Sequence, residues 1–151
     1  MEEYSKVLDR LQAQCSKREY CSSDIYRKAL KAMEGDGEAA ARITASLVKD
    51  RFVDDRRYAA AFAREKSSLQ GWGAVKIRFQ LRGKGIADEI VSEALQEIDS
   101  EKAASKLDKL AADRYRLLKD DPQCRLKLLK ALLSRGYSYD EVEDAVKRVM
   151  Q

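Results

Sequence analysis

The chain has 151 residues, of which 37% are charged and 44% hydrophobic, and its net charge is +4. This length suits one medium domain or a few small units, and no stretch approaches the ~20 consecutive apolar residues of a membrane span. The sequence contains no histidine, so serine and cysteine lack the usual activating base and the composition argues against an enzyme. The acidic, amphipathic start MEEYSKVLDRLQ differs from a signal peptide, and we expect a cytoplasmic protein.

Helical signals run through the whole sequence. Apolar residues recur three and four positions apart, for example at Ile43 and Leu47 and at Leu128 and Leu132, which is the period of an amphipathic helix. Alternating runs of β-branched residues, which would indicate strands, do not occur. In chain order the sequence predicts helices over residues 3–18, 23–34, 37–50, 54–69, 73–84, 87–98, 100–119, 123–135 and 139–150.

Residues that begin or end helices fall between these segments. Ser138 and Glu141 have the spacing of a capping box, and Gly85 and Gly136 stand where a left-handed residue would end a helix. Several helices are preceded by a side chain that can accept hydrogen bonds from the free N–H groups of the first turn. The expected N-caps are Ser22, Asp36, Asp54, Ser100 and Ser138.

The sequence aligns with itself when it is shifted by 51 residues. Leu30, Leu81 and Leu132 then correspond, and similar matches extend over two helices in three copies. A unit of three such helices buries too little apolar surface alone, whereas stacked neighbours bury a continuous core. We therefore predict an all-α protein, an elongated array of three tandem three-helix repeats with about nine helices. The expected repeats are residues 1–51, 52–100 and 101–151.

Positive charge is concentrated in the second expected repeat. Residues 56–84 contain eight basic side chains and one acidic side chain, Glu65, whereas residues 88–99 contain five acidic side chains and no basic one. A local field of this kind attracts phosphates or an acidic protein surface. The alternative is that the charges only solvate the helices.

The glycines of GWGAVKIRFQLRGKGI, residues 71–86, do not form a nucleotide-binding motif. In a phosphate-binding loop Gly83-Lys84 would be followed by serine or threonine to hold magnesium, but Gly85 follows here. In a dinucleotide fingerprint the third glycine would occupy the position of Lys76. We therefore interpret these glycines as helix punctuation.

An amphipathic helix accounts better for this segment. Arg78 and Arg82 would lie one turn apart, beside the stripe that faces the core. Phe79 would point away from that stripe and either pack against another helix, the favoured interpretation, or form an exposed aromatic among cations. Trp72 either packs at the entry of the helix or anchors an interface. The expected core stripe is Ala74, Ile77 and Leu81.

Cysteines 15, 21 and 124 give no metal-binding pattern. Cys15 and Cys21 are six residues apart, which is not a short metal-ligand spacing, and the chain has no histidine to complete a site. We expect reduced thiols, no bound metal and no cofactor.

The segment FVDDRRYAAAFAREKSSLQGWGAVKIRFQLRGKGI resembles the central region of the RecX regulatory proteins. It carries an Asp-Asp-Arg-x-Tyr/Phe-Ala-x-x-Phe start, a Gly-x-x-Lys/Arg-Ile middle and a Leu-x-x-Lys-Gly-Ile end. The resemblance is dense here, extends over the rest of the chain in length and repeat pattern, and is loosest in the first repeat. The matching residues are Asp54, Asp55, Arg56, Tyr58, Ala59, Phe62, Gly73, Lys76, Ile77, Leu81, Lys84, Gly85 and Ile86.

This resemblance implies tandem three-helix repeats and a non-enzymatic modulator of the RecA recombinase. Family members are understood to bind in the groove of the RecA–DNA filament and to restrain filament growth, ATP hydrolysis and strand exchange. They also bind DNA. It therefore implies a monomeric regulator of recombinational DNA repair and the SOS response, with the RecA filament as main partner and single- or double-stranded DNA as a weaker one.

On this hypothesis, the basic residues of the second repeat contact acidic RecA residues, DNA phosphates or both. Two other functions remain open from the sequence: a stand-alone helical DNA-binding protein, and a protein–protein scaffold that binds no nucleic acid. The expected contact residues are Arg56, Arg57, Lys76, Arg78, Arg82 and Lys84.

Overall fold

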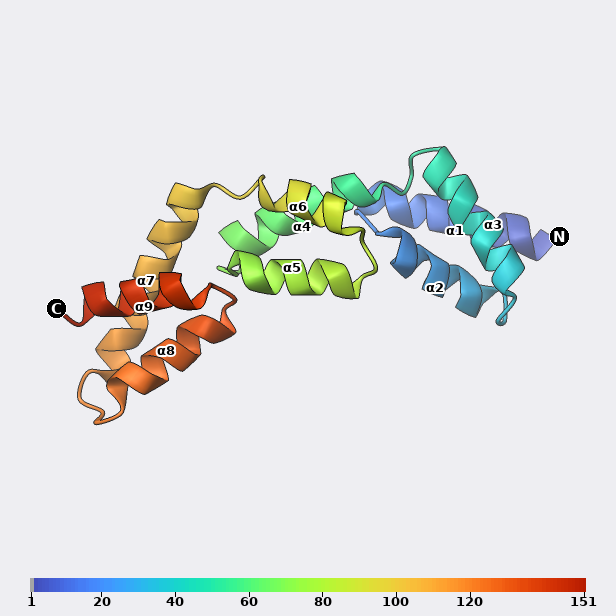
Figure 1. Ribbon diagram of the computed structural model, residues 1–151. Helices are drawn as coiled ribbons and strands as arrows, with labels where there is room; N and C mark the ends of the chain where they lie inside the picture. Colours follow the sequence, from blue (N-terminus) through green and yellow to red (C-terminus); the bar gives the residue numbers. More distant parts are fainter. Residues whose placement is uncertain (1) are drawn as a thin grey trace. The chain divides into compact units, whose positions relative to one another are not determined.

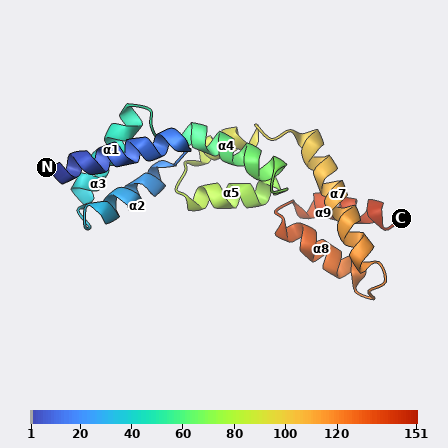
Figure 2. The same ribbon diagram turned by 180° about the vertical axis from the view of Figure 1, so that it is seen from behind.

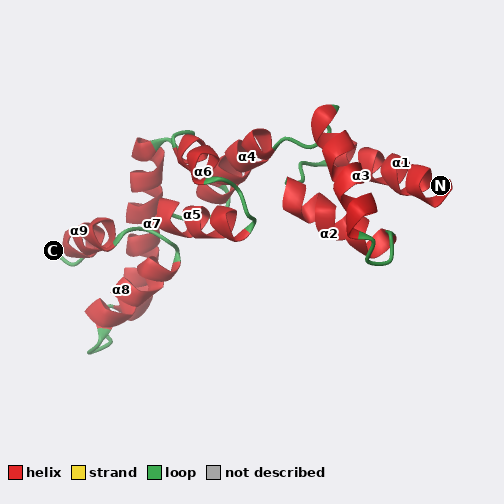
Figure 3. Ribbon diagram, turned by 45° about the vertical axis from the view of Figure 1, so that its right-hand side comes forward, coloured by secondary structure: helices red, strands yellow, loops and turns green. Residues whose placement is uncertain are grey.

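The computed structural model describes residues 2–151, and within this range it contains nine helices and no strand (Figure 3). The all-α prediction is therefore confirmed. The helices are α1 (Glu2–Lys17), α2 (Ser22–Ala32), α3 (Gly37–Lys49), α4 (Asp55–Ser68), α5 (Ala74–Gly83), α6 (Asp88–Leu95), α7 (Ser100–Leu118), α8 (Cys124–Ser134) and α9 (Tyr139–Val149).

The predicted helix bounds agree with the observed ones to within a few residues. The largest difference is in α6, which ends at Leu95 rather than at residue 98. The N–H groups of Gln96, Glu97 and Ile98 each donate to the carbonyl three residues back, at 3.1, 3.0 and 3.3 Å. This tighter turn ends the α-helical pattern although the apolar period continues through Ile98.

The chain forms two compact units, which we describe separately. The N-terminal unit comprises the residues up to Ala61 together with Leu81–Val91. The C-terminal unit comprises Phe62–Gln80 together with Ser92–Gln151.

The core of the N-terminal unit lies between α1, α2 and α3, which contact one another (Figure 2). Each helix contributes the residues that its apolar period predicts, and Leu8, Leu30 and Met33 pack against this core while remaining partly accessible. The fully packed residues are Val7, Leu11, Ile25, Ala29, Ala40, Ile43, Leu47 and Val53.

The core of the C-terminal unit lies between α7, α8 and α9 (Figure 1). Tyr137, in the turn between α8 and α9, is also buried there. Its phenol O–H donates to the carbonyl of Gly71 at 3.0 Å, so its polar group is satisfied although the ring is buried. The other core residues are Leu107, Ala111, Leu128, Leu132, Val142, Ala145 and Val146.

Three of the expected N-caps are confirmed. Asp36 accepts from the N–H of Ala39, Asp54 accepts from the N–H of Arg57, and Ser138 forms the predicted capping box with Glu141. These side chains satisfy backbone donors that have no partner within their helix.

Two expected N-caps are wrong. The cap of α7 is Asp99, whose carboxylate accepts from two N–H groups, and the expected Ser100 is the first residue of the helix. The cap of α2 is Cys21, whose side chain makes no cap bond. Ser22 is instead the first residue of α2, and its N–H donates to the carboxylate of Asp55 at 2.7 Å. A carboxylate from another helix thus replaces the local cap.

The turn after α2 holds a non-glycine residue in the left-handed conformation. Glu34 has φ 55°, whereas Gly85 and Gly136, which align with it at a shift of 51, have φ 76° and 95°. The N–H of Glu34 donates to the Lys31 carbonyl and that of Gly35 to the Leu30 carbonyl. Together these two hydrogen bonds form a Schellman C-cap, in which the left-handed residue is usually glycine.

Replacing Glu34 by glycine is expected to stabilise the protein by about 0.5–1 kcal/mol. Glycine removes the strain of a Cβ in the left-handed region, a gain partly offset by its greater freedom in the unfolded chain. Thermal unfolding followed by circular dichroism measures this. The control Glu34→Ala removes the same carboxylate but keeps the Cβ, so a gain in both variants would contradict the explanation.

Candidate partner-binding surface

The start of α5 is fixed by the turn that joins α8 to α9. The N–H of Gly73 donates to the Arg135 carbonyl at 2.8 Å, and the N–H of Val75 donates to the Gly136 carbonyl at 2.9 Å. These bonds satisfy N–H groups at the beginning of the helix. Backbone groups from a distant segment therefore hold the first turn of α5 within the C-terminal unit.

The contact between the start of α5 and the α8–α9 turn requires glycine at both position 73 and position 136. A Cβ added to Gly73 would lie 2.4 Å from the Gly136 carbonyl oxygen, and one added to Gly136 would lie 2.1 Å from the Cβ of Lys76. Both separations are shorter than atoms tolerate, and Gly136 also has φ 95°. The interpretation of Gly73 as helix punctuation is thus incomplete, because it also permits a close approach of two backbones.

Trp72 packs at the entry of α5. Its ring meets the ring of Phe62 edge-on, with centroids 6.1 Å apart and an interplanar angle of 70°. The ammonium groups of Lys66 and Lys76 lie 4.9 and 4.3 Å from the ring centre of Trp72, within the range of cation–π attraction. The ring is half-buried, which supports the packing interpretation of Trp72 over that of an interface anchor.

The face of α5 that carries Phe79 is exposed. Phe79 is 74% accessible and Val75, one turn earlier, is 55% accessible, whereas Ile77 and Leu81 are fully buried. The favoured interpretation of Phe79 as a packed residue is wrong. Ala74 is also exposed, so the prediction that it belongs to the core stripe is wrong. At this end of α5 the backbone N–H groups of Gly73 and Val75, rather than the Ala74 side chain, contact the α8–α9 turn.

Arg78 lies next to Phe79 and is exposed. Its guanidinium makes no hydrogen bond or ion pair with any residue in the range 2–151. We call the exposed set Val75, Arg78 and Phe79 the α5 stripe. It combines an aromatic ring, an aliphatic side chain and an uncompensated positive charge, which together suit an acidic protein surface with an apolar centre.

The other expected contact residue in the C-terminal unit is Lys76. Its side chain is half-buried and rests on the Trp72 ring. Arg78 and Lys76 are two residues apart in α5 and point in different directions from the helix.

The remaining four expected contact residues lie in the N-terminal unit. Arg57 is bonded to Glu19 at 2.7 Å and to the carbonyls of Arg51 and Phe52, and the bond to Glu19 raises the pKa of its guanidinium. Arg56 is exposed.

Arg82 and Lys84 are each paired with a carboxylate. Arg82 is 2.9 Å from Asp88 in an exposed pair, and Lys84 is 3.0 Å from Asp24, whose side chain is only 17% accessible. Exposed pairs of this kind exchange easily with a partner, whereas a half-buried pair is held more firmly. Lys84 is therefore more strongly engaged than Arg82.

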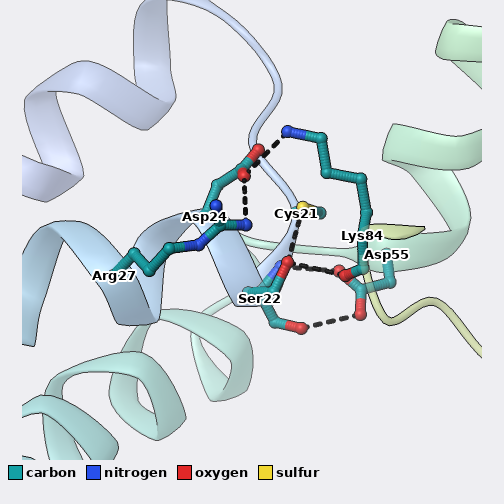
Figure 4. A network of polar contacts seen from close by, with 7 residues as sticks. Cys21, Ser22, Asp24, Arg27, Asp55 and Lys84 are labelled. Carbon is teal, nitrogen blue, oxygen red and sulfur yellow. Dashed lines mark hydrogen bonds and ion pairs between the residues drawn. The ribbon is translucent and has the colours of Figure 1, made fainter. Parts of the chain in front are cut away.

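Lys84 belongs to a polar network that sequence reasoning missed (Figure 4). The Asp24 carboxylate forms ion pairs with Lys84 and Arg27. The Asp55 carboxylate accepts hydrogen bonds from both the N–H and the hydroxyl of Ser22, each at 2.7 Å. Figure 4 shows these side chains converging at the start of α2. Their partners lie 33 and 60 residues away in the chain, so no local pattern in the sequence could identify them.

The network should make stability depend on acidic pH. Burial alone would raise the pKa of Asp24, but hydrogen bonds from Lys84 and Cys21 and the charge of Lys84 outweigh it, so the pKa lies below the ordinary 3.8. A lowered folded-state pKa contributes stability above the unfolded-state pKa, and this contribution disappears as pH falls through the folded-state value.

We expect Asp24→Asn to lose about 1–2 kcal/mol of unfolding free energy at pH 7, because it removes a charge-assisted hydrogen bond to Lys84. The deficit should shrink below about pH 4, where the parent carboxylate also begins to lose its charge. Urea unfolding at several pH values measures the loss of unfolding free energy and its dependence on pH. A loss that does not change with pH would contradict the role of the Asp24 charge.

The three cysteines are free thiols, as expected. Burial is the main reason why the pKa values of Cys15 and Cys21 are raised, which lowers the reactivity of a thiol. Across residues 2–151, no group of acidic residues and cysteines could hold a metal ion. No helix in the same range is long and apolar enough to span a membrane.

Comparison with known proteins identifies relatives of the chain. The family model described as RecX, second three-helix domain, matches residues 54–95. The curated Regulatory protein RecX of Clostridium botulinum is 33% identical over 126 residues, covering 76% of this chain and 55% of the relative. That of Clostridium beijerinckii is 30% identical over 135 residues, covering 87% and 62%. The chain thus spans about half to three-fifths of the length of these relatives.

Two solved structures share the fold. The crystal structure of regulatory protein RecX matches with a TM-score of 0.84 and 28% identity, covering 97% of this chain and 72% of that one. The crystal structure of RecX from Lactobacillus salivarius matches with a TM-score of 0.81 and 21% identity, covering 98% and 97%.

Proposed function

The chain belongs to the RecX family, and from this we propose that it is a non-enzymatic regulator that binds the RecA–DNA filament. In this proposal it lowers RecA ATP hydrolysis, filament extension and strand exchange, and so restrains recombinational DNA repair. The filament is its main partner and DNA alone is a weaker one.

The observation that supports a protein partner most directly is the exposure of the α5 stripe. A 74% accessible phenylalanine costs solvation free energy unless a partner covers it. Aromatic residues and arginine are also the residues most enriched at the energetic centres of protein interfaces. A partner with carboxylates around an apolar patch would satisfy both Phe79 and Arg78.

The six expected contact residues take different parts in this proposal. Arg78 can meet a partner without breaking any bond of its own. Arg57, Arg82 and Lys84 would have to exchange Glu19, Asp88 and Asp24 for the partner's acidic groups. We therefore expect Arg78 to contribute more than Arg57, Arg82 or Lys84.

A stand-alone DNA-binding protein is the second candidate, because eight basic side chains fall within residues 56–84. Fluorescence anisotropy of a labelled oligonucleotide separates the two functions when the protein is titrated with and without RecA. The RecA proposal predicts tighter binding to the RecA-coated strand than to bare DNA. Equal or weaker binding to the coated strand would favour the DNA-binding candidate.

A further inference from the structure

The fold gathers four cations around the segment Ser68–Trp72, between α4 and α5 in the C-terminal unit. Lys106 of α7 donates to the Ser68 carbonyl at 3.5 Å, and Arg135, after α8, donates to the Gln70 carbonyl at 2.8 Å. The other two are the lysines on the Trp72 ring. We call Lys66, Lys76, Lys106 and Arg135 the cation cluster.

Carbonyl groups and an aromatic ring hold the cation cluster, rather than acidic side chains. Throughout the described chain, none of its four members forms an ion pair with a carboxylate. Two acidic residues of the same unit are engaged elsewhere, since Glu97 faces Arg64 at 3.8 Å and Asp99 caps α7. Four positive charges are therefore assembled without a carboxylate bonded to any of them, which creates a field that attracts polyanions.

An open cavity of about 330 Å³ adjoins the cluster at Ser68 and Lys106. Its walls also contain Arg64, Lys102 and the hydroxyl-bearing Ser67, together with two carboxylates, Glu97, which faces Arg64, and Asp99, which caps α7. Ammonium groups, a guanidinium and hydroxyls are the donors that contact phosphate oxygens in nucleic-acid complexes. Three cations, Arg64, Lys102 and Lys106, outnumber the two carboxylates, so the cavity extends the cationic surface beyond the cluster with a smaller excess of charge.

We infer that the cation cluster and this cavity bind the phosphates of a nucleic-acid strand. Three of the four cluster residues are lysines, which are depleted at protein interfaces but common where proteins meet nucleic acids. The aromatic ring in the cluster is half-buried and faced by two ammonium groups, so it offers no apolar anchor to a protein partner. The α5 stripe, in contrast, exposes the ring of Phe79, which can serve as an apolar anchor for a protein partner.

This inference deepens the proposed function and rests on it only for the choice of DNA as the natural ligand. It assigns DNA contact to residues other than the α5 stripe, and three of its cations, Lys66, Lys106 and Arg135, were not among the expected contact residues. Binding of DNA by the cluster can be tested without RecA, so the two proposals can fail independently.

The test is a titration of the full chain with a single-stranded oligonucleotide, followed by anisotropy of the labelled strand and by Trp72 fluorescence. Trp72 is the chain's single tryptophan, so its emission reports directly on the cluster. We expect binding to change Trp72 emission. We expect Lys106→Gln/Arg135→Gln to weaken binding about tenfold at low salt and to reduce the slope of log K against log salt by about 1.4.

The matched control is Lys119→Gln/Lys130→Gln, which removes the same charge at exposed positions near the end of α7 and in α8. Lys106→Gln alone tests the inference if the double variant unfolds, because its 3.5 Å bond contributes little to stability. The single variant Lys106→Gln should weaken binding to the oligonucleotide about threefold. DNA affinity equal to that of the control, or loss of RecA binding with unchanged DNA affinity, would overturn the inference.

Discussion

Gly73→Ala is expected to destabilise the protein by ~3 kcal/mol or more. This is the largest loss of stability that we predict for a single substitution. The added Cβ would lie 2.4 Å from the Gly136 carbonyl oxygen and 2.5 Å from the Tyr137 nitrogen. These are backbone atoms, which cannot move aside as a flexible side chain would. Relief of the clash would break the bonds from Gly73 and Val75 to the α8–α9 turn.

Thermal and urea unfolding measure this loss, and Gly83→Ala is the matched control. Gly83 ends α5 and a Cβ there would meet no atom within 4 Å. Alanine at that position should be neutral or stabilising by up to about 1 kcal/mol, because it favours the helix over glycine. Similar stability of the Gly73→Ala and Gly83→Ala variants would contradict the close backbone contact.

Arg78→Glu/Phe79→Ala is expected to weaken binding to the RecA–DNA filament by about 1,000-fold. Loss of a buried aromatic anchor and repulsion between a glutamate and an acidic surface each cost ~2 kcal/mol or more at the centre of an interface. Both side chains are exposed in the free protein, so the variant should keep its stability. Co-sedimentation with filaments measures the affinity.

Arg125→Glu/Leu126→Ala is the control for this variant. It changes an adjacent arginine and apolar residue on α8, and both are exposed, Leu126 at 48%. It makes the same change in charge within the same unit but leaves the α5 stripe intact. Equal loss of binding in the two variants would show that the overall charge, and not the α5 stripe, determines affinity.

Local sequence patterns were sufficient to predict the helices. The apolar period marks each buried stripe, and capping residues such as Asp36 and Ser138 act on N–H groups only three residues away. Asp99 escaped prediction because Ser100, beside it, is also a good cap. A choice between neighbouring caps depends on backbone angles that sequence alone does not determine.

The surface was harder to predict than the helices. The position of Phe79 opposite the core stripe follows from helix geometry, but whether another helix covers that side depends on tertiary packing. Its exposure became evident only in the structure. The same is true of Lys84, whose positive charge suggested a contact residue and whose carboxylate partner, Asp24, is 60 residues away.

Long-range contacts account for what the sequence did not predict. Gly73 and Gly136 look like two helix-breaking residues until their backbones are seen to meet. Lys106 and Arg135 look like ordinary solvated charges until both are found on the same turn. Features that depend on pairs of residues more than 30 positions apart leave no periodic signal in one sequence.

The single-stranded-DNA-dependent ATPase of the cognate RecA, measured while this protein is titrated in, tests the central claim most directly. We expect the ATPase rate to fall to a low plateau as the protein saturates the filament. Arg78→Glu/Phe79→Ala should require a much higher concentration for the same effect, whereas the Arg125→Glu/Leu126→Ala control should act like the parent. An ATPase rate that stays unchanged at saturating parent protein would contradict the proposed function.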